Sequence, residues 1–230
     1  MSKPTGLDFS AVLASSVHDM KNSLSLLLTS IDEIGLELSA ADSPIADRMA
    51  TLQYEAARVN NDLVQLLSLY KLDQNVLAPT IDEHHVRDLL EEEVARYQPL
   101  FQSREVRCQI ECADDLFGFF DRDLISGVIG NVLANTIRYT RRNIEVSAEA
   151  TGKGGVIIRV EDDGQGFPQR MLDQDVALNA TTNFQTGSTN LGLYFAKRVA
   201  QLHQQDDRAG SVDLSNGGRL GGGVFRLILP

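Results

Sequence analysis

Apolar residues recur at alternating intervals of four and three positions along two stretches near the start of the chain. This heptad spacing is typical of helices that pack along one side against other helices. The first stretch ends at "AADSP", residues 40–44, where Pro44 suits the first turn of a new helix. The spacing therefore predicts two long helices joined by a short turn, which is a helical hairpin. The two patterns are Leu13, Val17, Met20, Leu24, Leu27, Ile31, Ile34 and Leu38, followed by Ile45, Met49, Leu52, Ala56, Val59, Leu63, Leu66 and Tyr70.

The predicted hairpin carries more apolar surface than a single copy can bury. Each fully buried Leu or Ile contributes roughly 1.5–3 kcal/mol, so pairing with the hairpin of a second copy into a four-helix bundle is strongly favoured. We therefore expect a homodimer formed through residues 8–73. The alternative is a monomeric bundle in which the hairpin packs against the rest of the chain.

Composition excludes several classes of partner. Of the 230 residues, 43% are hydrophobic, which is ordinary for a folded globular protein, and the net charge is −11. A chain this acidic is not expected to bind nucleic acid or an anionic membrane surface, because phosphate binding needs clustered Lys and Arg. The sequence shows neither a membrane span nor an export signal, so we expect a cytoplasmic protein. Cys108 and Cys112 would lie ~13 Å apart on one strand, so we interpret both as reduced thiols.

The pattern changes after "LDQNVLAPT" at residues 72–80, which we interpret as a linker. Beyond it, strands and helices mix without regular alternation, and this predicts an α+β two-layer sandwich. The fold class is thus a helical hairpin that forms a dimeric four-helix bundle, followed by a sandwich domain, with domains at 1–75 and 76–230. The expected helices span 86–101, 121–139 and 191–202, and the expected strands span 106–112, 116–120, 144–150, 156–161, 212–215 and 224–229.

A histidine stands beside the first heptad pattern, in "SSVHDMKNSL" at residues 15–24. If Val17 and Met20 point into the bundle, His18 lies on the solvent flank, and Asn22 shares that face one turn further on. A carboxylate such as Asp19 can hold an imidazole, fix its tautomer and stabilise its positive charge, so His18 is a candidate nucleophile. The alternative is a solvated His–Asp pair on a helix surface.

Three motifs in the second domain suggest a nucleotide site. In "GNVLANTIRYT", Asn131 and Asn135 lie one helical turn apart, with Arg138 and Tyr139 just beyond, so Asn135 could bind Mg²⁺ and Arg138 could reach phosphate. In "VEDDGQGFP", Asp162 ends a strand and could accept the amine of adenine, while glycines let backbone approach the base. In "TGSTNLGLYFAKRVAQLH", a Gly-containing loop leads into a helix N-terminus, which suits phosphate. The candidate binding residues in the two glycine motifs are Asp162, Gly164, Gly166, Gly187, Leu191 and Gly192.

Together with the hairpin, these motifs resemble those of the sensor histidine kinases of two-component signalling. Residues 8–73 resemble the dimerisation and phosphotransfer hairpin, and residues 79–230 resemble the catalytic ATP-binding domain shared with gyrase. The resemblance implies ATP and Mg²⁺ as cofactors, a flexible lid at about 167–189, and a response-regulator receiver domain as partner. It makes His18 the phosphoacceptor, oriented or deprotonated by Asp19, and it makes Asn135 the Mg²⁺ ligand and Asp162 the adenine contact.

The sequence departs from the family pattern at several positions. The usual proline after the histidine is Ser23, the middle glycine of the second glycine motif is Asn190, and Phe184 is the one candidate for an aromatic box. A glycine pair that often follows the last helix is Gln204–Gln205. The sequence begins almost at the hairpin, so we expect its input to come from an upstream sensor protein, from a ligand on this core, or from a further region.

Three functions follow from these motifs. The leading one is an ATP-dependent protein-histidine kinase that passes its phosphoryl group to a response-regulator aspartate. The second is a phosphotransfer adaptor whose degenerate second domain binds no nucleotide. The third is an anti-sigma-type protein-serine kinase, which would need neither His18 nor the long hairpin. The spacing of Asp19 and Asn22 also resembles the family signature of a regulator phosphatase, with Asn22 positioning a water.

Overall fold

The computed structural model describes residues 20, 24, 27–29, 31, 34, 44–73, 78–152, 154–172 and 191–230. The chain divides into two compact units, Met1–Leu77 and Ala78–Pro230. Among the described residues, no helix is both long enough and apolar enough to cross a lipid bilayer.

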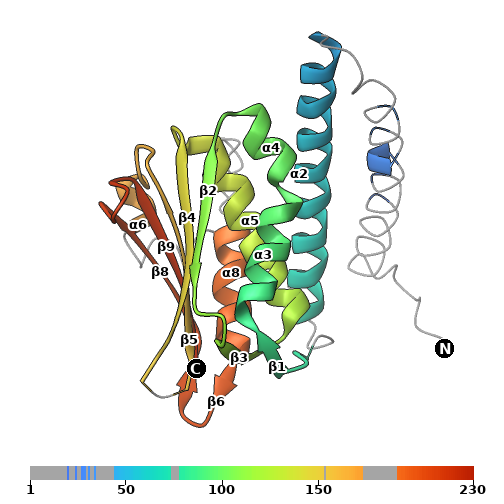
Figure 1. Ribbon diagram of the computed structural model, residues 1–230. Coiled ribbons are helices and arrows are strands. Elements are labelled where there is room, and N and C mark those ends of the chain that lie inside the picture. The colour runs from blue at the N-terminus through green and yellow to red at the C-terminus, as the bar shows by residue number, and fades with distance from the viewer. Residues whose placement is uncertain are drawn as a thin grey trace, which may run out of the picture. The chain divides into compact units, whose positions relative to one another are not determined.

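The described part of the first unit includes the long helix α2, Pro44–Asp73 (Figure 1). The second heptad pattern lies along it. Leu52, Val59 and Leu66 occupy one heptad position and are 51, 43 and 39% exposed, whereas the alternating position is half-buried at Ala56, Leu63 and Tyr70. Met20, Leu24, Ile31 and Ile34 are helical as well. The residues that would join the two helices lie outside the described ranges, so the hairpin and its dimer stay predictions.

Five strands form the main sheet of the second unit, in the order β2-β4-β5-β9-β8. β2 and β4 run parallel, and the other neighbouring strands run antiparallel. Each strand matches a predicted one to within a residue at either end, which confirms the expected α+β sheet. Their bounds are β2 Arg107–Cys112, β4 Asn143–Ala150, β5 Val156–Asp162, β8 Ser211–Asn216 and β9 Gly223–Leu229.

Three helices cover one face of this sheet (Figure 1). They are α3, Val86–Arg96, α5, Arg122–Tyr139, and α8, Leu191–Leu202. The core lies between the two layers, because apolar side chains on the helices are buried against the inward residues of the strands. It includes Leu89, Leu90, Ile129, Leu133, Phe195 and Val199 from the helices, and Val146, Ile158 and Leu227 from the strands. Cys108 and Cys112, both half-buried on β2, are free thiols.

The prediction of one helix over residues 86–101 is wrong. α3 ends at Arg96, and a short helix α4, Gln98–Ser103, follows after Tyr97. Pro99 stands at the start of α4. It explains the break, since proline lacks an N–H and its ring clashes with the preceding helical turn.

Several short elements were not predicted. β1, Asp82–His85, pairs antiparallel with β3, Phe117–Phe120, of which only β3 was expected. β6, Gln204–Gln205, pairs with β7, Arg208–Ala209. α6, Gln169–Leu172, occupies the first part of the expected lid, and the remainder of that lid, residues 173–189, lies outside the described ranges.

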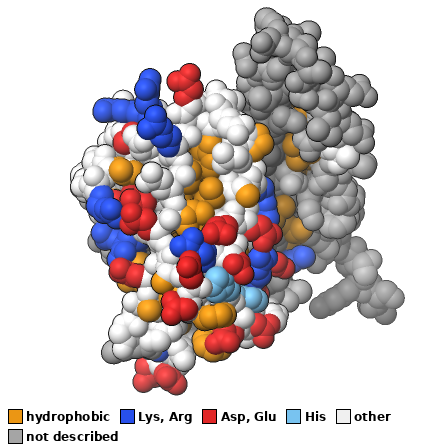
Figure 2. All heavy atoms as spheres, in the orientation of Figure 1, with side chains coloured by type: hydrophobic (Ala, Val, Ile, Leu, Met, Phe, Trp, Pro, Cys, Tyr) orange, Lys and Arg blue, Asp and Glu red, His pale blue; other side chains and the backbone are white. Residues whose placement is uncertain are grey.

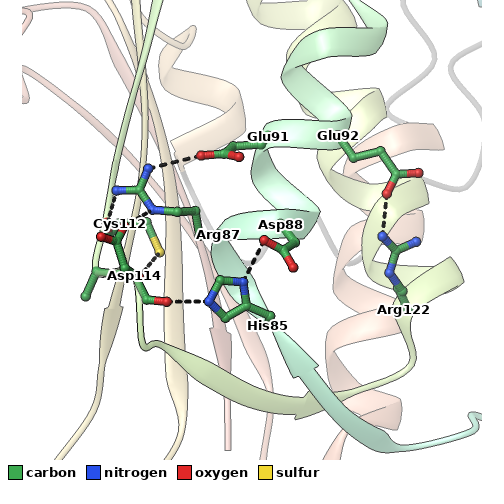
Figure 3. A network of polar contacts seen from close by, with 9 residues as sticks. His85, Arg87, Asp88, Glu91, Glu92, Cys112, Asp114 and Arg122 are labelled. Carbon is green, nitrogen blue, oxygen red and sulfur yellow. Dashed lines mark hydrogen bonds and ion pairs between the residues drawn. The ribbon is translucent and has the colours of Figure 1, made fainter.

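A polar network fastens β1 and α3 to the connection between β2 and β3 (Figure 3). His85 Nδ1 lies 2.8 Å from Asp88, and the other ring nitrogen contacts the carbonyl of Asp114. These two contacts raise the pKa of His85, the Asp114 carbonyl more than the Asp88 carboxylate. Arg87 Nε lies 2.7 Å from the Asp114 carboxylate. Figure 2 shows histidine side chains beside a hydrophobic area. The ring of His85 lies 5.1 Å from that of Phe117.

Candidate functional site

Helix α5 carries the asparagine motif and is fixed at both ends. Its N-cap residue Asp121 accepts a hydrogen bond from Leu124 N at 3.0 Å, as an acidic cap should. Asn131 is half-buried and Asn135 is exposed. The Asn135 amide nitrogen donates to Asn131 O at 2.9 Å and to Asn131 Oδ1 at 3.2 Å. Because both bonds use the NH₂ group, the amide oxygen of Asn135 is directed away from them, as a metal ligand requires.

Arg138 and Tyr139 end the same helix and are both exposed. The Arg138 guanidinium lies 5.5 Å from the centre of the Tyr139 ring, within the range of a cation–π contact. This contact holds a positive charge at the last turn of α5. The structure places the pair on the helix as predicted and leaves its role in phosphate binding untested.

Asp162 ends β5 and is 8% exposed. Its carboxylate accepts a hydrogen bond from Gly164 N at 2.6 Å. Burial raises the pKa of Asp162, while hydrogen bonds from the Gly164 and Gly223 backbones act in the opposite direction. A carboxylate held in this way is a buried, oriented acceptor, which suits the amine of a purine.

Glycines pack closely around Asp162. A Cβ on Gly164 would lie 2.3 Å from Tyr139 O, and one on Gly222 would lie 2.5 Å from Asp162 Oδ1. Real side chains do not approach this closely, so these positions must stay glycine for the backbone to pack as it does. A buried carboxylate surrounded by closely packed glycine backbone is an acceptor that fits the exocyclic amine of an adenine nucleotide.

The second glycine motif also contacts α5. Gly192 lies in the first turn of α8, where a Cβ would be 2.1 Å from Asn131 Nδ2. Both glycine motifs therefore border the helix that carries the asparagines: Gly164 at Tyr139 and Gly192 at Asn131. Leu191 is half-buried beside Gly192. Gly187, Asn190, Phe184, His18, Asp19 and Asn22 lie outside the described residues.

Asp163 is a residue to which the sequence analysis gave no role. Its carboxylate accepts from Thr140 Oγ1 at 2.7 Å, from the backbone N–H groups of Arg141, Arg142 and Asn143 at 2.8, 2.9 and 3.1 Å, and from Asn143 Nδ2 at 2.8 Å. Burial opposes ionisation, but the hydrogen bonds outweigh it and hold the pKa of Asp163 well below its usual range. The pattern "EDDG" offers no local signal for this role, because its donors lie about twenty residues earlier in the chain.

Comparison with known proteins agrees with this arrangement. Residues 120–230 match the family described as "Histidine kinase-, DNA gyrase B-, and HSP90-like ATPase". The chain is 28% identical to the alginate biosynthesis sensor protein KinB of Pseudomonas aeruginosa over 83% of its own length and 31% of that protein. It is 29% identical to the CAI-1 autoinducer sensor kinase/phosphatase CqsS of Vibrio cholerae over 81% of its own length and 29% of that protein.

Among solved structures, the fold resembles that of the Acinetobacter baumannii histidine kinase AdeS, with a TM-score of 0.59 at 16% identity. That likeness covers 92% of this chain and 96% of the AdeS chain. The chain spans about a third of the length of the two curated relatives described above. Residues 120–230 therefore have the fold of this ATPase family, and the chain is similar in sequence to sensor histidine kinases over most of its length.

Proposed function

We propose that this chain is an ATP-dependent protein-histidine kinase that phosphorylates its own His18 and passes the phosphoryl group to an aspartate of a response-regulator receiver domain. The observation that carries the proposal is the convergence of both glycine motifs on helix α5, with Gly164 against Tyr139 and Gly192 against Asn131. Convergence of this kind favours the kinase over a phosphotransfer adaptor, because an adaptor that binds no nucleotide would not need such close packing.

The proposed nucleotide site divides into two ends. At the purine end, Asp162 accepts the exocyclic amine of adenine, and the backbones of Gly164 and Gly166 lie along the ring. At the phosphate end, Asn135 supplies an amide oxygen to Mg²⁺, while Asn131, Arg138, Tyr139, Gly187, Leu191 and Gly192 border the phosphates. In the described part of the chain, no group of three His, Cys, Asp or Glu side chains could hold a metal ion. Mg²⁺ would therefore take its other ligands from phosphate and water, as it commonly does.

When bound, ATP supplies the γ-phosphoryl group and Mg²⁺ neutralises part of its charge. A ring nitrogen of His18 forms a bond to the γ-phosphorus as the bond to the bridging oxygen breaks, and ADP leaves. Asp19 accepts or positions the proton of the other ring nitrogen, which keeps the attacking nitrogen unprotonated. A receiver-domain aspartate then takes the phosphoryl group from His18.

We also propose that Asn22 serves the reverse function of dephosphorylating the regulator. It would stand one turn from His18 on the same helix face, where its amide could hold a water in line with the aspartyl phosphate. The CqsS relative is named as a sensor kinase/phosphatase, which supports the proposal of a second activity of this type.

We further propose a cytoplasmic homodimer formed through residues 8–73, within domains at 1–75 and 76–230. The alternation along α2 supports the dimer, because one heptad position is half-buried while the other exposes Leu52, Val59 and Leu66. Input would come from an upstream sensor protein or a further region.

The test combines three forms of the protein with labelled ATP and Mg²⁺. Wild type should form an acid-labile, alkali-stable phosphoprotein, and His18→Gln should form none. Asn22→Ala, the matched control on the same helix face, should still autophosphorylate but lose the ability to speed decay of the phosphorylated regulator. Label that persists in His18→Gln would show that the phosphoacceptor is wrongly assigned.

A further inference from the structure

The loop between β8 and β9, residues 217–222, is fastened to three other strands of the sheet. Arg219 N donates to Glu161 Oε2 at 2.8 Å. Its guanidinium lies 2.7 Å from Glu111 and 3.0 Å from Glu145. Glu145 and Glu161 are 6 and 7% exposed, so two buried carboxylates meet this one residue. The loop is therefore held over the ends of β2, β4 and β5 rather than extending into solvent.

The same loop packs against Asp162. Gly222 N donates to Asp162 O at 2.9 Å, and a Cβ on Gly223 would lie 2.9 Å from Asp162 Oδ2. The loop also closes on itself, with Gly217 N donating to Gly222 O at 2.8 Å. Whatever fixes this loop therefore also fixes the carboxylate proposed to recognise adenine.

Asn216 connects the last residue of β8 to the segment that follows Asp162. Phe167 N donates to Asn216 Oδ1 at 2.7 Å, and Asn216 Nδ2 donates to Phe167 O at 2.9 Å. The side-chain amide thus satisfies both backbone groups of a residue 49 positions away, as a neighbouring strand would. Gly166 has a φ of +77°, and a Cβ there would lie 2.6 Å from Asn216 Oδ1, so glycine is required for the contact to form.

We propose that Asn216 is a positioning residue for the purine end of the nucleotide site. The inference rests on the proposed function, in which adenine binds between Asp162 and the Gly164–Gly166 backbone. That segment is anchored at its start by the hydrogen bonds of Asp163 and at its end by Asn216. Two glycines lie between the anchors, and glycine backbone samples many conformations when it is released. Asn216 keeps the segment in the one conformation that leaves room for the ring beside Asp162.

The test compares wild type, Asn216→Ala and Asn216→Asp, with Ser211→Ala as control at the far end of the same strand. Asn216→Ala removes both hydrogen bonds, and Asn216→Asp keeps an acceptor for Phe167 N–H but loses the donor to Phe167 O. Calorimetry with a non-hydrolysable ATP analogue and Mg²⁺ should show affinity weakened about three- to tenfold in Asn216→Ala. Asn216→Asp should be intermediate and Ser211→Ala unchanged. The preference for the ATP analogue over its GTP counterpart should fall in the same order, because the loosened segment no longer aligns Asp162 with the purine amine.

A second measurement uses the nucleotide-free protein. Hydrogen–deuterium exchange at the Phe167 amide should be faster in Asn216→Ala, while the thermal midpoint should match that of Ser211→Ala. Unchanged exchange, or faster exchange with unaltered affinity and unaltered purine preference, would overturn the positioning role. If wild type itself bound no nucleotide, the proposed function would fail and this inference with it. A defect confined to the variants would leave the proposed function standing.

Discussion

At the scale of single residues, neighbouring positions in one motif take different tasks. The Asp162 carboxylate packs against glycine backbone, while the Asp163 carboxylate accepts hydrogen bonds from the backbone N–H groups that follow α5. A carboxylate at a strand end before glycines suggests recognition of a base, and this role of Asp162 stays a prediction. No local pattern indicates the contacts of Asp163, because its donors are set by tertiary packing.

Asp163→Asn should destabilise the ATP-binding unit by about 1–3 kcal/mol. The amide keeps one acceptor oxygen but presents NH₂ to the backbone N–H groups around the carboxylate, so at least one of these donors loses its charged partner. Urea unfolding of the whole chain measures the effect. Asp213→Asn, at a half-buried position on β8, is the control and should change the free energy of unfolding little. Equal stability of wild type and Asp163→Asn would show that water replaces the carboxylate without loss.

At the scale of elements, the sequence pattern predicted those strands and helix ends that depend on residues close together in the chain. The alternation of apolar residues gave the five main strands within a residue, and Asp121 gave the start of α5. Pro99 was a signal that the helix predicted over residues 86–101 ends before that proline. β1 could not be predicted, because "DEHH" lacks apolar alternation and becomes a strand by pairing with β3. The Arg219 contacts join residues up to 108 positions apart, and no pattern in "NGGRLGGG" indicates them.

The exposed heptad position of α2 predicts that a substitution there disrupts the dimer without unfolding the helix. Val59→Asp places a charge where the proposed partner hairpin packs, and burying an unpaired charge costs several kcal/mol, so the dimer should dissociate while α2 stays helical. Val64→Asp is matched in residue type, helix and exposure, since Val64 is 36% exposed and lies off the heptad pattern. It should leave the mass unchanged in light scattering. A wild-type protein that is already a folded monomer at micromolar concentration would contradict the dimer.

At the scale of the ATP-binding unit, one buried histidine joins the two helices that carry the site motifs. His203 follows α8 and is 1% exposed. Its Nδ1 donates to Val199 O at 2.8 Å, and its Nε2 accepts from Asp121 N, the N-cap residue of α5, at 2.9 Å. The ring therefore needs the neutral tautomer with the proton on Nδ1. Burial lowers the pKa of His203, while the Val199 carbonyl and the Asp121 carboxylate oppose the shift.

The stability of the unit should consequently fall in mild acid. A histidine whose pKa is lower in the folded state contributes fully above its unfolded pKa of about 6.5, and that contribution is lost as the pH falls towards the folded value. Protonation would add a proton to His203 Nε2, so that two donors face each other at Asp121 N–H. Loss of this hydrogen bond would separate the start of α5 from the end of α8. Urea unfolding at pH 7.5 and pH 5.5 measures the change.

Two histidine variants identify the group that causes the loss of stability in mild acid. His203→Gln should be less stable than wild type at pH 7.5 and should lose less stability between the two pH values, because glutamine does not titrate there. His85→Gln should have the reverse effect on the slope. The pKa of His85 is raised in the fold, so its contribution is present below pH about 6.5 and declines as the pH rises through the folded value. If His203→Gln lost as much stability on acidification as wild type, the acid sensitivity would belong to the carboxylates, and His203 would serve packing alone.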